Sequence, residues 1–386
     1  TCLGLEQAAA TALAASLHLE HPEIRIRVLD FCPDTVDSDV ISRIYTEICT
    51  SAAFYAAGYD AELKRRAPRP ALRNPAEYLP RPISWSARDV FLVTGGAKGI
   101  TAECAFAFAQ KEKVQMILVG SSPLPLRDDQ QSEIARTLER YSAVELPVQY
   151  YQCDITNAVA VKELIRQIQK EYGSITGVIH GSAQNSPREL QSTSLPDVLE
   201  EIAPKLLGLI NLCTVLDDSP PKLFIAFSSI ISVTGMMGNG WYGFSNEAMQ
   251  FAMRQYAELF PQTAVLSIAF SIWDEVGMGM KMGSTTRLAK MGIDAIPVQE
   301  GVAHFLRLAA YDPGDNQVIV TARTAGLNTF TPPLPTIDGL RFLEKITNYY
   351  PGIELTSRAW LTHERDTYLE DHIWHGTSLF PLVFGL

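Results

Sequence analysis

The chain has 386 residues, of which 47% are hydrophobic and 19% charged, and its formal net charge is −11. That length is enough for two domains, or for one large domain with an appendage. The acidic balance argues against nucleic acid as a partner, and no stretch is apolar for long enough to span a membrane. The six cysteines include no CxxC pair and no Cys/His cluster, which indicates buried free thiols in a cytoplasmic protein without disulfides or a metal site.

Residues 1–63 predict part of an α/β subdomain. Gln7 to Leu19 is alanine-rich and helical, residues 24–31 alternate like a half-buried strand, and Val40 to Tyr59 is helical again. The first residues include neither an initiator methionine nor the basic region of a signal peptide. We therefore expect the chain to be a piece of a longer protein.

Residues 64–87 form a basic, proline-rich segment that begins Lys64-Arg65-Arg66. Its prolines, at positions 68, 70, 75, 80 and 82, exclude a regular helix, so we predict a linker on the surface. Its basic residues suit a solvated tether, and the alternative is a contact patch for an acidic carrier domain.

From Asp89 onward, apolar strands alternate with helices. This alternation predicts a parallel, doubly wound sheet with helices on both faces, over residues 88–330. The predicted strands are Val90–Thr94, Gln115–Gly120, Pro147–Gln152, Ile175–His180, Leu223–Ser228, Thr263–Ala269 and Val318–Thr321. The predicted helices are Ala102–Lys111, Ser132–Tyr141, Ala158–Tyr172, Pro196–Leu216 and Asn246–Glu258.

The first of these strands runs into a glycine-rich turn, Thr94-Gly95-Gly96-Ala97-Lys98-Gly99-Ile100, which opens a helix. Glycines let the backbone turn sharply and approach a pyrophosphate, and the helix N-terminus offers free N–H groups. The strand–turn–helix context favours a dinucleotide site, and the alternative is a plain tight turn.

The end of the second strand bears on which dinucleotide binds. A carboxylate there favours NAD, whereas this strand is followed by Ser121 and Ser122. Lys98 can meet a 2′-phosphate together with both hydroxyls, which favours NADPH. Asp154, after the third strand, is placed either to accept a hydrogen bond from the adenine amino group or to cap the next helix.

Four polar residues further along form a candidate reducing centre: Lys205, Ser229, Tyr242 and Asn246. Ser229 ends an apolar strand, and ligands bind at the carboxyl ends of strands in open α/β sheets. Tyr242 and Asn246 are spaced to share one face of a helix, and Lys205 lies on the preceding helix.

Ketone reduction needs these residue types. A phenol with a pKa of about 10 is a poor acid at neutral pH, so a nearby ammonium is expected to lower the pKa of Tyr242 toward the working range. Ser229 is expected to hydrogen-bond the ketone oxygen. Asn246 is expected to hold a water that returns protons to Lys205.

Residues 88–325 resemble the ketoreductase domain of a type I polyketide synthase, within the short-chain dehydrogenase/reductase superfamily. The matching stretches are TGGAKGI, CDIT (153–156), VIHGSA (178–183), PKLLGL (204–209), FSSI (227–230) and YGFSN (242–246). As in polyketide ketoreductases, Asn246 stands where ordinary short-chain dehydrogenases carry lysine, and Lys205 comes from the earlier helix. Residues 1–85 resemble the second half of the structural subdomain that precedes such a catalytic subdomain.

The resemblance implies a Rossmann fold and NADPH-dependent reduction of a carrier-bound β-ketoacyl thioester to the β-hydroxyacyl thioester. It implies that Tyr242 is the general acid and that Ser229 orients the carbonyl. Lys205 would tune Tyr242 and bind ribose, while Asn246 would support the proton relay. The implied cofactor contacts are Thr94, Gly95, Gly96, Lys98, Gly99, Ile100, Ser121, Ser122, Asp154, Ile155, His180, Gly181, Lys205 and Tyr242.

Some positions depart from the family pattern. Ser121 stands where typical modular ketoreductases carry arginine. Residues 184–187 replace the Leu-Asp-Asp stereochemical fingerprint, and Thr234 replaces the alternative tryptophan, so the configuration of the alcohol is not predicted. GITAEC (99–104), HGSAQNSPREL (180–190) and VGMGMKMG (276–283) resemble iterative synthases of the enediyne and polyunsaturated fatty acid kind.

Two further segments carry predictions. Trp273 to Pro297 is rich in methionine and glycine, which suits either a mobile lid over an acyl chain or a loosely packed pair of helices. Within residues 331–386, His372, Gly376 and Pro381 form HxxxGxxxxP, which resembles the start of a hotdog-fold dehydratase. The chain ends before the aspartate that would partner His372, so no dehydration is expected from it.

The predicted partners are an acyl carrier protein with a phosphopantetheine-linked chain and neighbouring synthase domains: dehydratase, ketosynthase and acyltransferase. Two alternatives stay open. One is a free-standing short-chain alcohol dehydrogenase, and the other is a catalytically silent structural domain of a synthase.

Overall fold

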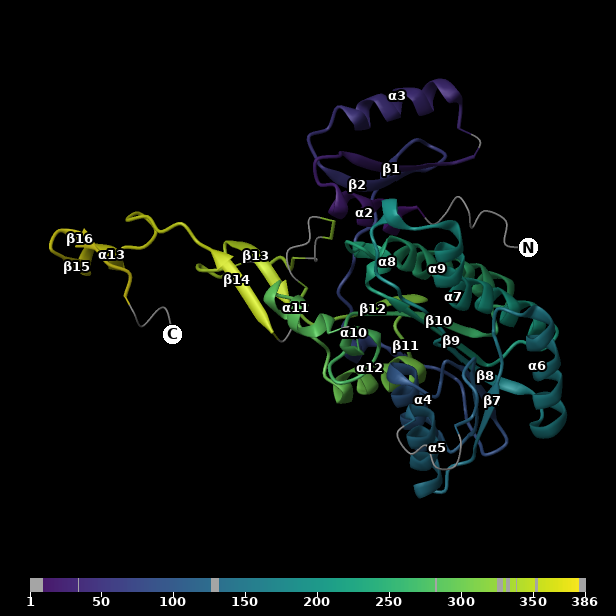
Figure 1. Cartoon of the computed structure of the whole chain (residues 1–386). Coiled ribbons are helices and arrows are strands. Elements are labelled where there is room, and N and C mark those ends of the chain that lie inside the picture. Colours follow the sequence, from purple (N-terminus) through teal and green to yellow (C-terminus); the bar gives the residue numbers. More distant parts are fainter. Residues whose placement is uncertain are drawn as a thin grey trace. The chain divides into compact units, whose positions relative to one another are not determined.

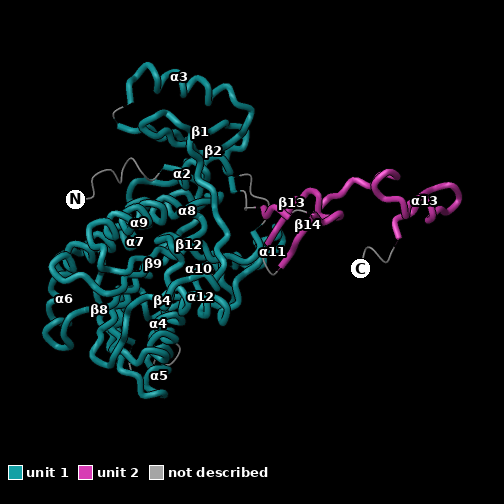
Figure 2. Tube along the Cα trace, turned by 180° about the vertical axis from the view of Figure 1, so that it is seen from behind, with its two compact units in different colours: residues 1–331 teal, residues 332–386 magenta. Residues whose placement is uncertain are grey.

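The computed structural model describes residues 10–33, 35–125, 132–281, 283–324, 329–330, 334–337, 339–350 and 353–381. Figure 2 shows its two compact units, residues 1–331 and residues 332–386. Within the described part of the chain, no helix combines the length and the apolar character needed to cross a bilayer.

A seven-stranded parallel sheet lies at the centre of the first unit (Figure 1). Its order is β12-β10-β9-β8-β5-β6-β7, so the chain starts in the middle, builds one half and then crosses over to build the other. The strands are β5 (Val90–Thr94), β6 (Gln115–Gly120), β7 (Val148–Gln152), β8 (Ile175–His180), β9 (Leu223–Ser229), β10 (Ala264–Phe270) and β12 (Gln317–Val320). The predicted doubly wound sheet is confirmed, and every predicted strand is present.

Helices cover both faces of this sheet because its strands are apolar on both sides. Phe91 and Val93 of β5 join one buried cluster, while Val90 and Leu92 join the other. The helices are α4 (Gly99–Glu112), α5 (Glu133–Ala143), α6 (Ala158–Tyr172), α7 (Leu195–Val215), α9 (Gly240–Leu259) and α12 (Val298–Ala310). The first cluster includes residues of α4, α5 and α12, and the second includes residues of α6, α7 and α9.

The N-terminal subdomain differs from the prediction in its second half. Its elements are α2 (Thr11–Glu20), β1 (Ile26–Phe31), α3 (Asp37–Ile48), β2 (Phe54–Tyr59) and β3 (Arg65–Arg66). The predicted helix from Val40 to Tyr59 is wrong, because its last residues form β2, which pairs in parallel with β1. The aromatic residues of β2 favour a strand.

The prediction of buried thiols is also wrong for Cys49, which is exposed, while Cys104 and Cys153 are buried.

The proline-rich segment is held at both ends, so the prediction of a solvated tether is wrong there. Arg65 Nε donates to Oε1 of the buried Glu47 at 2.7 Å. At the other end, β4 (Leu79–Pro80) pairs antiparallel with β11 (Tyr311–Asp312), and the Arg81 N–H donates to the Ala310 carbonyl at 2.9 Å. Between them lies the short 3₁₀ helix η1 (Pro75–Glu77).

Helix α2 joins the N-terminal subdomain to α9. The Ala12 N–H donates to Glu247 Oε2 at 2.8 Å, so a carboxyl of α9 caps the first turn of α2. Glu247 is buried, and this burial raises the pKa of its carboxyl to about 7, against the hydrogen bonds from Ala12 and Thr11.

We expect this carboxyl to make the folded state less stable by about 2 kcal/mol at pH 8 than at pH 5.5. In the folded state Glu247 keeps its proton up to a pKa of about 7, whereas the pKa of an unperturbed glutamate, as in the unfolded chain, is 4.5. The contribution of Glu247 to the free energy of unfolding is therefore complete below its pKa in the unfolded chain. It disappears as the pH rises through its pKa in the folded state. Because Lys205 changes stability in the opposite direction, urea unfolding is compared between variants: raising the pH from 5.5 to 8 should cost the wild type about 2 kcal/mol more than it costs Glu247→Gln. The exposed Glu258, at the end of the same helix, supplies the control Glu258→Gln. Equal pH dependence in wild type and Glu247→Gln would contradict this.

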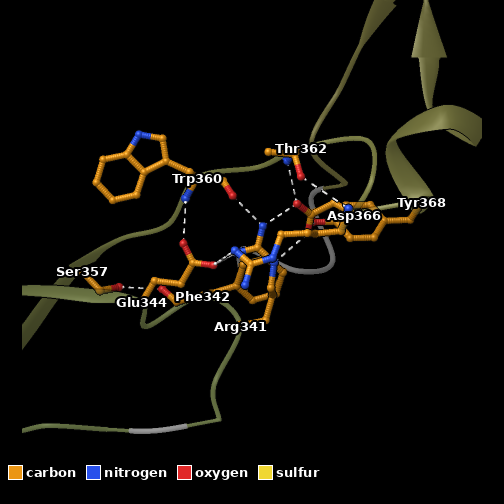
Figure 3. Close-up of polar contacts among 9 residues, drawn as sticks. Arg341, Phe342, Glu344, Ser357, Trp360, Thr362, Asp366 and Tyr368 are labelled. Carbon is orange, nitrogen blue, oxygen red and sulfur yellow. Dashed lines mark hydrogen bonds and ion pairs between the residues drawn. The ribbon is translucent and has the colours of Figure 1, made fainter.

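The second unit contains two short hairpins and one polar cluster. β13 (Lys345–Tyr350) pairs with β14 (Glu354–Arg358), and after α13 (Tyr368–Asp371) β15 (Ile373–Trp374) pairs with β16 (Thr377–Ser378). Figure 3 shows Arg341 donating to Asp366, to Glu344 and to the Trp360 carbonyl. Asp366 is buried, and it also accepts the Thr362 N–H at 2.8 Å. The cluster ties the segment before β13 to the turn before α13.

Candidate functional site

A cavity of about 500 Å³ opens at the carboxyl ends of the central strands. Its walls include residues that follow β5, β6, β7, β8 and β9, together with parts of α7 and α9. Predicted site residues on its wall are Gly95, Lys98, Gly99, Ile100, Ser121, Ser122, Asp154, Ile155, Gly181, Lys205, Ser229 and Tyr242. One cavity therefore collects the glycine-rich turn and three members of the predicted reducing centre.

The glycine-rich turn borders the cavity and packs closely on its neighbours. Gly95 has φ +69, and a Cβ there would lie 2.9 Å from the backbone carbonyl carbon of Gly181, so only glycine fits both the conformation and the space. Gly96 packs inward instead, since a Cβ there would lie 2.6 Å from Val93. The Gly99 N–H opens α4 and donates to Glu133 Oε1 at 3.0 Å. The turn therefore brings Gly95, Lys98 and the N-terminus of α4 to the cavity wall, where the Glu133 carboxylate binds the Gly99 N–H group.

Thr94 and His180 lie beneath the cavity rather than on its wall. Both side chains are fully buried, and Thr94 Oγ1 is 2.8 Å from His180 Nδ1. His180 Nε2 lies 2.8 Å from the Lys205 carbonyl oxygen. Burial lowers the pKa of His180 to about 3, so the imidazole is neutral. The pair joins β5, β8 and α7 under the site, which makes it a support and not the direct cofactor contact expected from the sequence.

The end of β6 presents one cation and two hydroxyls to the cavity. Lys98 Nζ donates to Ser122 Oγ at 3.0 Å, so the ammonium from the glycine-rich turn reaches the end of β6. Asp154 Oδ1 accepts the Thr156 N–H and the Thr156 hydroxyl. Asn157, and not Asp154, caps α6 through its side chain. The helix-cap alternative for Asp154 is therefore wrong.

Tyr242 and Ser229 meet at the floor of the cavity. Ser229 is the last residue of β9, and Tyr242 lies in the first turn of α9. Burial raises the pKa of Tyr242 to about 12, while hydrogen bonds with Asn246 and Ser229 act in the opposite direction. The lowering of this pKa predicted from the sequence is wrong for this geometry, because desolvation outweighs the other effects. A phenol with this pKa holds its proton at neutral pH and gives it up less readily than an unperturbed phenol does.

Lys205 is buried in α7 and its ammonium points to the sheet. Nζ donates to the Phe227 carbonyl oxygen at 2.7 Å. Burial lowers the pKa of Lys205 to about 7. The group can therefore exchange a proton near neutral pH, which is what a proton relay requires.

Asn246 lies behind Tyr242 and not on the cavity wall. Its Nδ2 donates to the Tyr242 carbonyl oxygen at 2.7 Å, and its side chain is fully buried. Among the residues that the structure describes, Oδ1 has no hydrogen-bond partner. A buried acceptor of this kind is expected to find a donor, so the site suits the water predicted for the relay.

The sequence analysis missed Glu201, one turn before Lys205 on α7. Its carboxyl is buried, and it accepts the Ser186 N–H at 3.4 Å. Burial raises the pKa of Glu201, and its charge in turn raises the pKa of Tyr242. The spacing Glu201–Lys205 was visible in the sequence as two groups on one helix face.

The methionine-rich segment folds as a pair of short helices. They are α10 (Met278–Lys281) and α11 (Ser284–Lys290), and Trp273 pairs with Ile296 across the base of the segment. Gly277, Met278, Arg287 and Leu288 line the cavity. The helix-pair alternative is therefore what the structure shows, and the pair forms one wall of the site.

His372 lies in the second unit, exposed, directly after α13. Its carbonyl oxygen accepts the Leu379 N–H at 2.8 Å across the β15–β16 hairpin. Among the described residues no group of three or more His, Cys, Asp and Glu side chains is arranged to hold a metal ion.

Comparison with known proteins identifies the central domain. The family model described as the KR domain matches residues 90–275, which include Lys205, Ser229, Tyr242 and Asn246. Residues 90–275 are a KR domain. The relatives of this domain are polyketide synthases, so it is a ketoreductase of the polyketide synthase type, an oxidoreductase domain.

Two relatives show how the KR domain is embedded. Polyketide synthase PksN of Bacillus subtilis is 32% identical over 248 residues, which cover 62% of this chain and 4% of that protein. The 6-methylsalicylic acid synthase of Penicillium patulum is 25% identical over 319 residues, which cover 81% of this chain and 17% of that protein. The chain therefore spans a small part of the length of these relatives.

A solved structure agrees with the fold. The ketoreductase from the first module of phoslactomycin biosynthesis in a Streptomyces species superimposes with a TM-score of 0.70 at 20% identity, covering 86% of this chain and 74% of that one. The predicted short-chain dehydrogenase fold is confirmed. A KR domain of this fold implies a nicotinamide cofactor, and Gly95, Lys98 and Gly99 of the glycine-rich turn line the cavity that would hold it.

Proposed function

We propose that this chain reduces a carrier-bound β-ketoacyl thioester to the β-hydroxyacyl thioester, using NADPH. The observation that carries the proposal is the meeting of Tyr242, Ser229 and Lys205 on the wall of the cavity that also contains the glycine-rich turn. A nicotinamide cofactor bound along that turn supplies the hydride.

In this proposal each residue of the centre has one role. Ser229 donates a hydrogen bond to the ketone oxygen and orients it. Tyr242 gives its phenolic proton to that oxygen as negative charge develops there. Lys205, with a pKa of about 7, supports the reprotonation of Tyr242, and a water held at Asn246 Oδ1 returns protons to Lys205. The same lysine binds the ribose of the cofactor.

A cofactor-oxidation assay tests the proposal directly. The full chain is incubated with a β-ketoacyl thioester mimic and NADPH or NADH, and the cofactor absorbance is followed. We expect oxidation of NADPH and formation of the β-hydroxyacyl thioester. No oxidation of either cofactor would leave the silent structural domain as the better proposal. The matched residues cover only 4% and 17% of the two synthases. This small share favours a component of a synthase over a free-standing alcohol dehydrogenase.

NADPH is proposed over NADH because Lys98 stands at the end of β6 with Ser121 and Ser122. Lys98→Ala is expected to raise the KM for NADPH about ten-fold or more, since a charge-assisted hydrogen bond to phosphate is lost. The KM for NADH should stay within about two-fold, because no 2′-phosphate is present. Lys111→Ala, on the exposed end of α4, is the matched control. A Lys98→Ala variant that still prefers NADPH would remove the basis for this assignment.

We also propose an acyl carrier protein as the source of substrate, with dehydratase, ketosynthase and acyltransferase domains as neighbours. The names of the relatives support this, since they are multidomain synthases. We propose four segments: a structural subdomain (residues 1–63), a linker (64–87), the catalytic domain (88–330), and a second linker with the start of a dehydratase (331–386). The proposal also includes the narrower likeness to iterative enediyne and polyunsaturated fatty acid synthases and a cytoplasmic location. It includes His372 as a dehydratase residue whose aspartate partner is not in this chain.

A further inference from the structure

One carboxylate of the N-terminal subdomain contacts two loops of the KR domain at once. Glu20 is the last residue of α2. Its Oε1 accepts the Gly238 N–H at 3.0 Å, and its Oε2 accepts the Leu190 N–H at 3.0 Å. Hydrogen bonds to an ionised acceptor are stronger than neutral ones. Each oxygen of Glu20 therefore holds one loop.

The two loops also contact each other. Leu190 begins the short 3₁₀ helix η2 (Leu190–Ser192), and Gly238 lies between α8 (Ile231–Thr234) and α9. The Arg188 N–H donates to the Gly238 carbonyl at 2.8 Å. A Cβ on Gly240 would lie 2.5 Å from Leu190 Cδ2, so the loops are in close contact. Glu20 fastens this contact from outside.

Both loops form walls of the catalytic cavity. Asn185 and Pro187 of the first loop and Met236 and Asn239 of the second line it, and Tyr242 follows directly on α9. The distance between these walls sets the space beside the phenol that donates the proton. A shift of either loop changes how a keto group can lie against Tyr242 and Ser229.

Helix α2 is itself fixed to the second loop and to α9. The Met236 N–H donates to Ser16 Oγ at 3.1 Å, and the Ala12 N–H donates to Glu247. A Cβ on Gly235 would lie 2.6 Å from the Ser16 backbone nitrogen. These contacts fix the position of α2, and therefore of Glu20, relative to the loop between α8 and α9.

From these contacts we propose that Glu20 is a positioning residue that sets the shape of the substrate end of the cavity and the orientation of the keto group. This rests on the proposed function, because it concerns the same site. The residue touches neither substrate nor cofactor. It acts through the walls at Asn185, Pro187, Met236 and Asn239, and it makes the N-terminal subdomain part of substrate recognition.

The test compares Glu20→Gln with Glu23→Gln in the full chain. Glutamine has the size of glutamate but presents an NH₂ group to one of the two N–H donors, so one loop is released. Glu23 is exposed in the same subdomain and serves as the control. We expect Glu20→Gln to raise the KM for the β-ketoacyl thioester roughly five- to ten-fold and to increase the share of the minor alcohol isomer, with kcat and cofactor Kd nearly unchanged.

Hydrogen exchange keeps the test independent of activity. Faster exchange of the Leu190 and Gly238 amides in Glu20→Gln, with unchanged thermal stability, supports the proposal even if the wild type reduces no substrate and the proposed function fails. Glu20→Asp keeps the charge but is too short to reach both loops, so it should fall between wild type and Glu20→Gln. Identical KM, isomer ratio and amide exchange in Glu20→Gln and Glu23→Gln would overturn the proposal.

Discussion

Tyr242→Phe is expected to lower kcat about 10²–10⁴-fold, the usual cost of losing a general acid. The change removes one hydroxyl from a buried ring at the floor of the cavity and leaves the packing of that ring in place. Because burial raises the pKa of Tyr242 to about 12, the lost group carries its proton throughout the neutral range. Cofactor oxidation with a β-ketoacyl thioester mimic measures the rate, and fluorescence titration measures cofactor binding, which should change by less than about ten-fold.

Tyr256 supplies the matched control for this experiment. It lies on the same helix α9, is also buried, and its hydroxyl has no hydrogen-bond partner among the residues that the structure describes. Tyr256→Phe therefore removes an equivalent atom far from the cavity wall and should leave kcat unchanged. Equal rates in wild type and Tyr242→Phe would show that another group donates the proton. Loss of activity in both variants would point to a general loss of structure.

Lys205→Met is expected to make the protein more stable at pH 7 while abolishing most of its activity. Burial depresses the pKa of Lys205 from 10.5 to about 7, and a shift of this size corresponds to about 4 kcal/mol of destabilisation at pH 7. Methionine fills similar space without a charge, but it leaves the Phe227 carbonyl oxygen without its donor, which costs about 1–3 kcal/mol. The net gain is about 2 kcal/mol.

The lowered pKa of Lys205 also makes the stability of the wild type depend on pH. Above a pH of about 7 the folded state releases the proton of Lys205, whereas the unfolded chain keeps it up to the ordinary lysine pKa of 10.5. The wild type should therefore gain stability as the pH rises through this window, and the Met variant should not. Urea unfolding at pH 7 and 9 measures both effects. Lys162→Met, at an exposed position of α6, should change stability by less than about 0.5 kcal/mol. A less stable or fully active Lys205→Met would contradict the arrangement described for α7.

Local sequence signals were sufficient for the sheet and for most of the site. The strands β5 to β10 are apolar runs bounded by turn residues, and the glycine-rich turn is contiguous, so Gly95 and Lys98 could be placed on the cavity without a structure. Lys205, Ser229 and Tyr242 come from three separate elements; their residue types and spacing suggested a reducing centre, and the resemblance gave each of them its role. The helix expected from Val40 to Tyr59 failed because an alanine pair within β2 looks helical until its pairing with β1 is known.

What could not be predicted depends on contacts between distant residues. The pKa of Tyr242 follows from burial by elements far away in the chain, and its direction was therefore predicted wrongly. Thr94 and His180 have the right neighbours in sequence for cofactor contacts, yet their side chains turn inward to each other. Glu20 and Glu247 are ordinary helix carboxylates in the sequence, and only the docking of α2 on α9 gives them their donors.

The docking of α2 also has a consequence in time. The Ala12–Glu247 contact joins residues 235 positions apart, and the Glu20–Gly238 contact spans 218 positions. At about 5–20 residues per second, the ribosome needs on the order of 10–50 s to make the chain between the two partners. During that interval α2 has left the ribosome while the helix and loop that satisfy it do not yet exist. Until α9 is synthesised, the α2 residues that the folded chain buries, among them Ala12, Ala15 and Ser16, therefore remain uncovered.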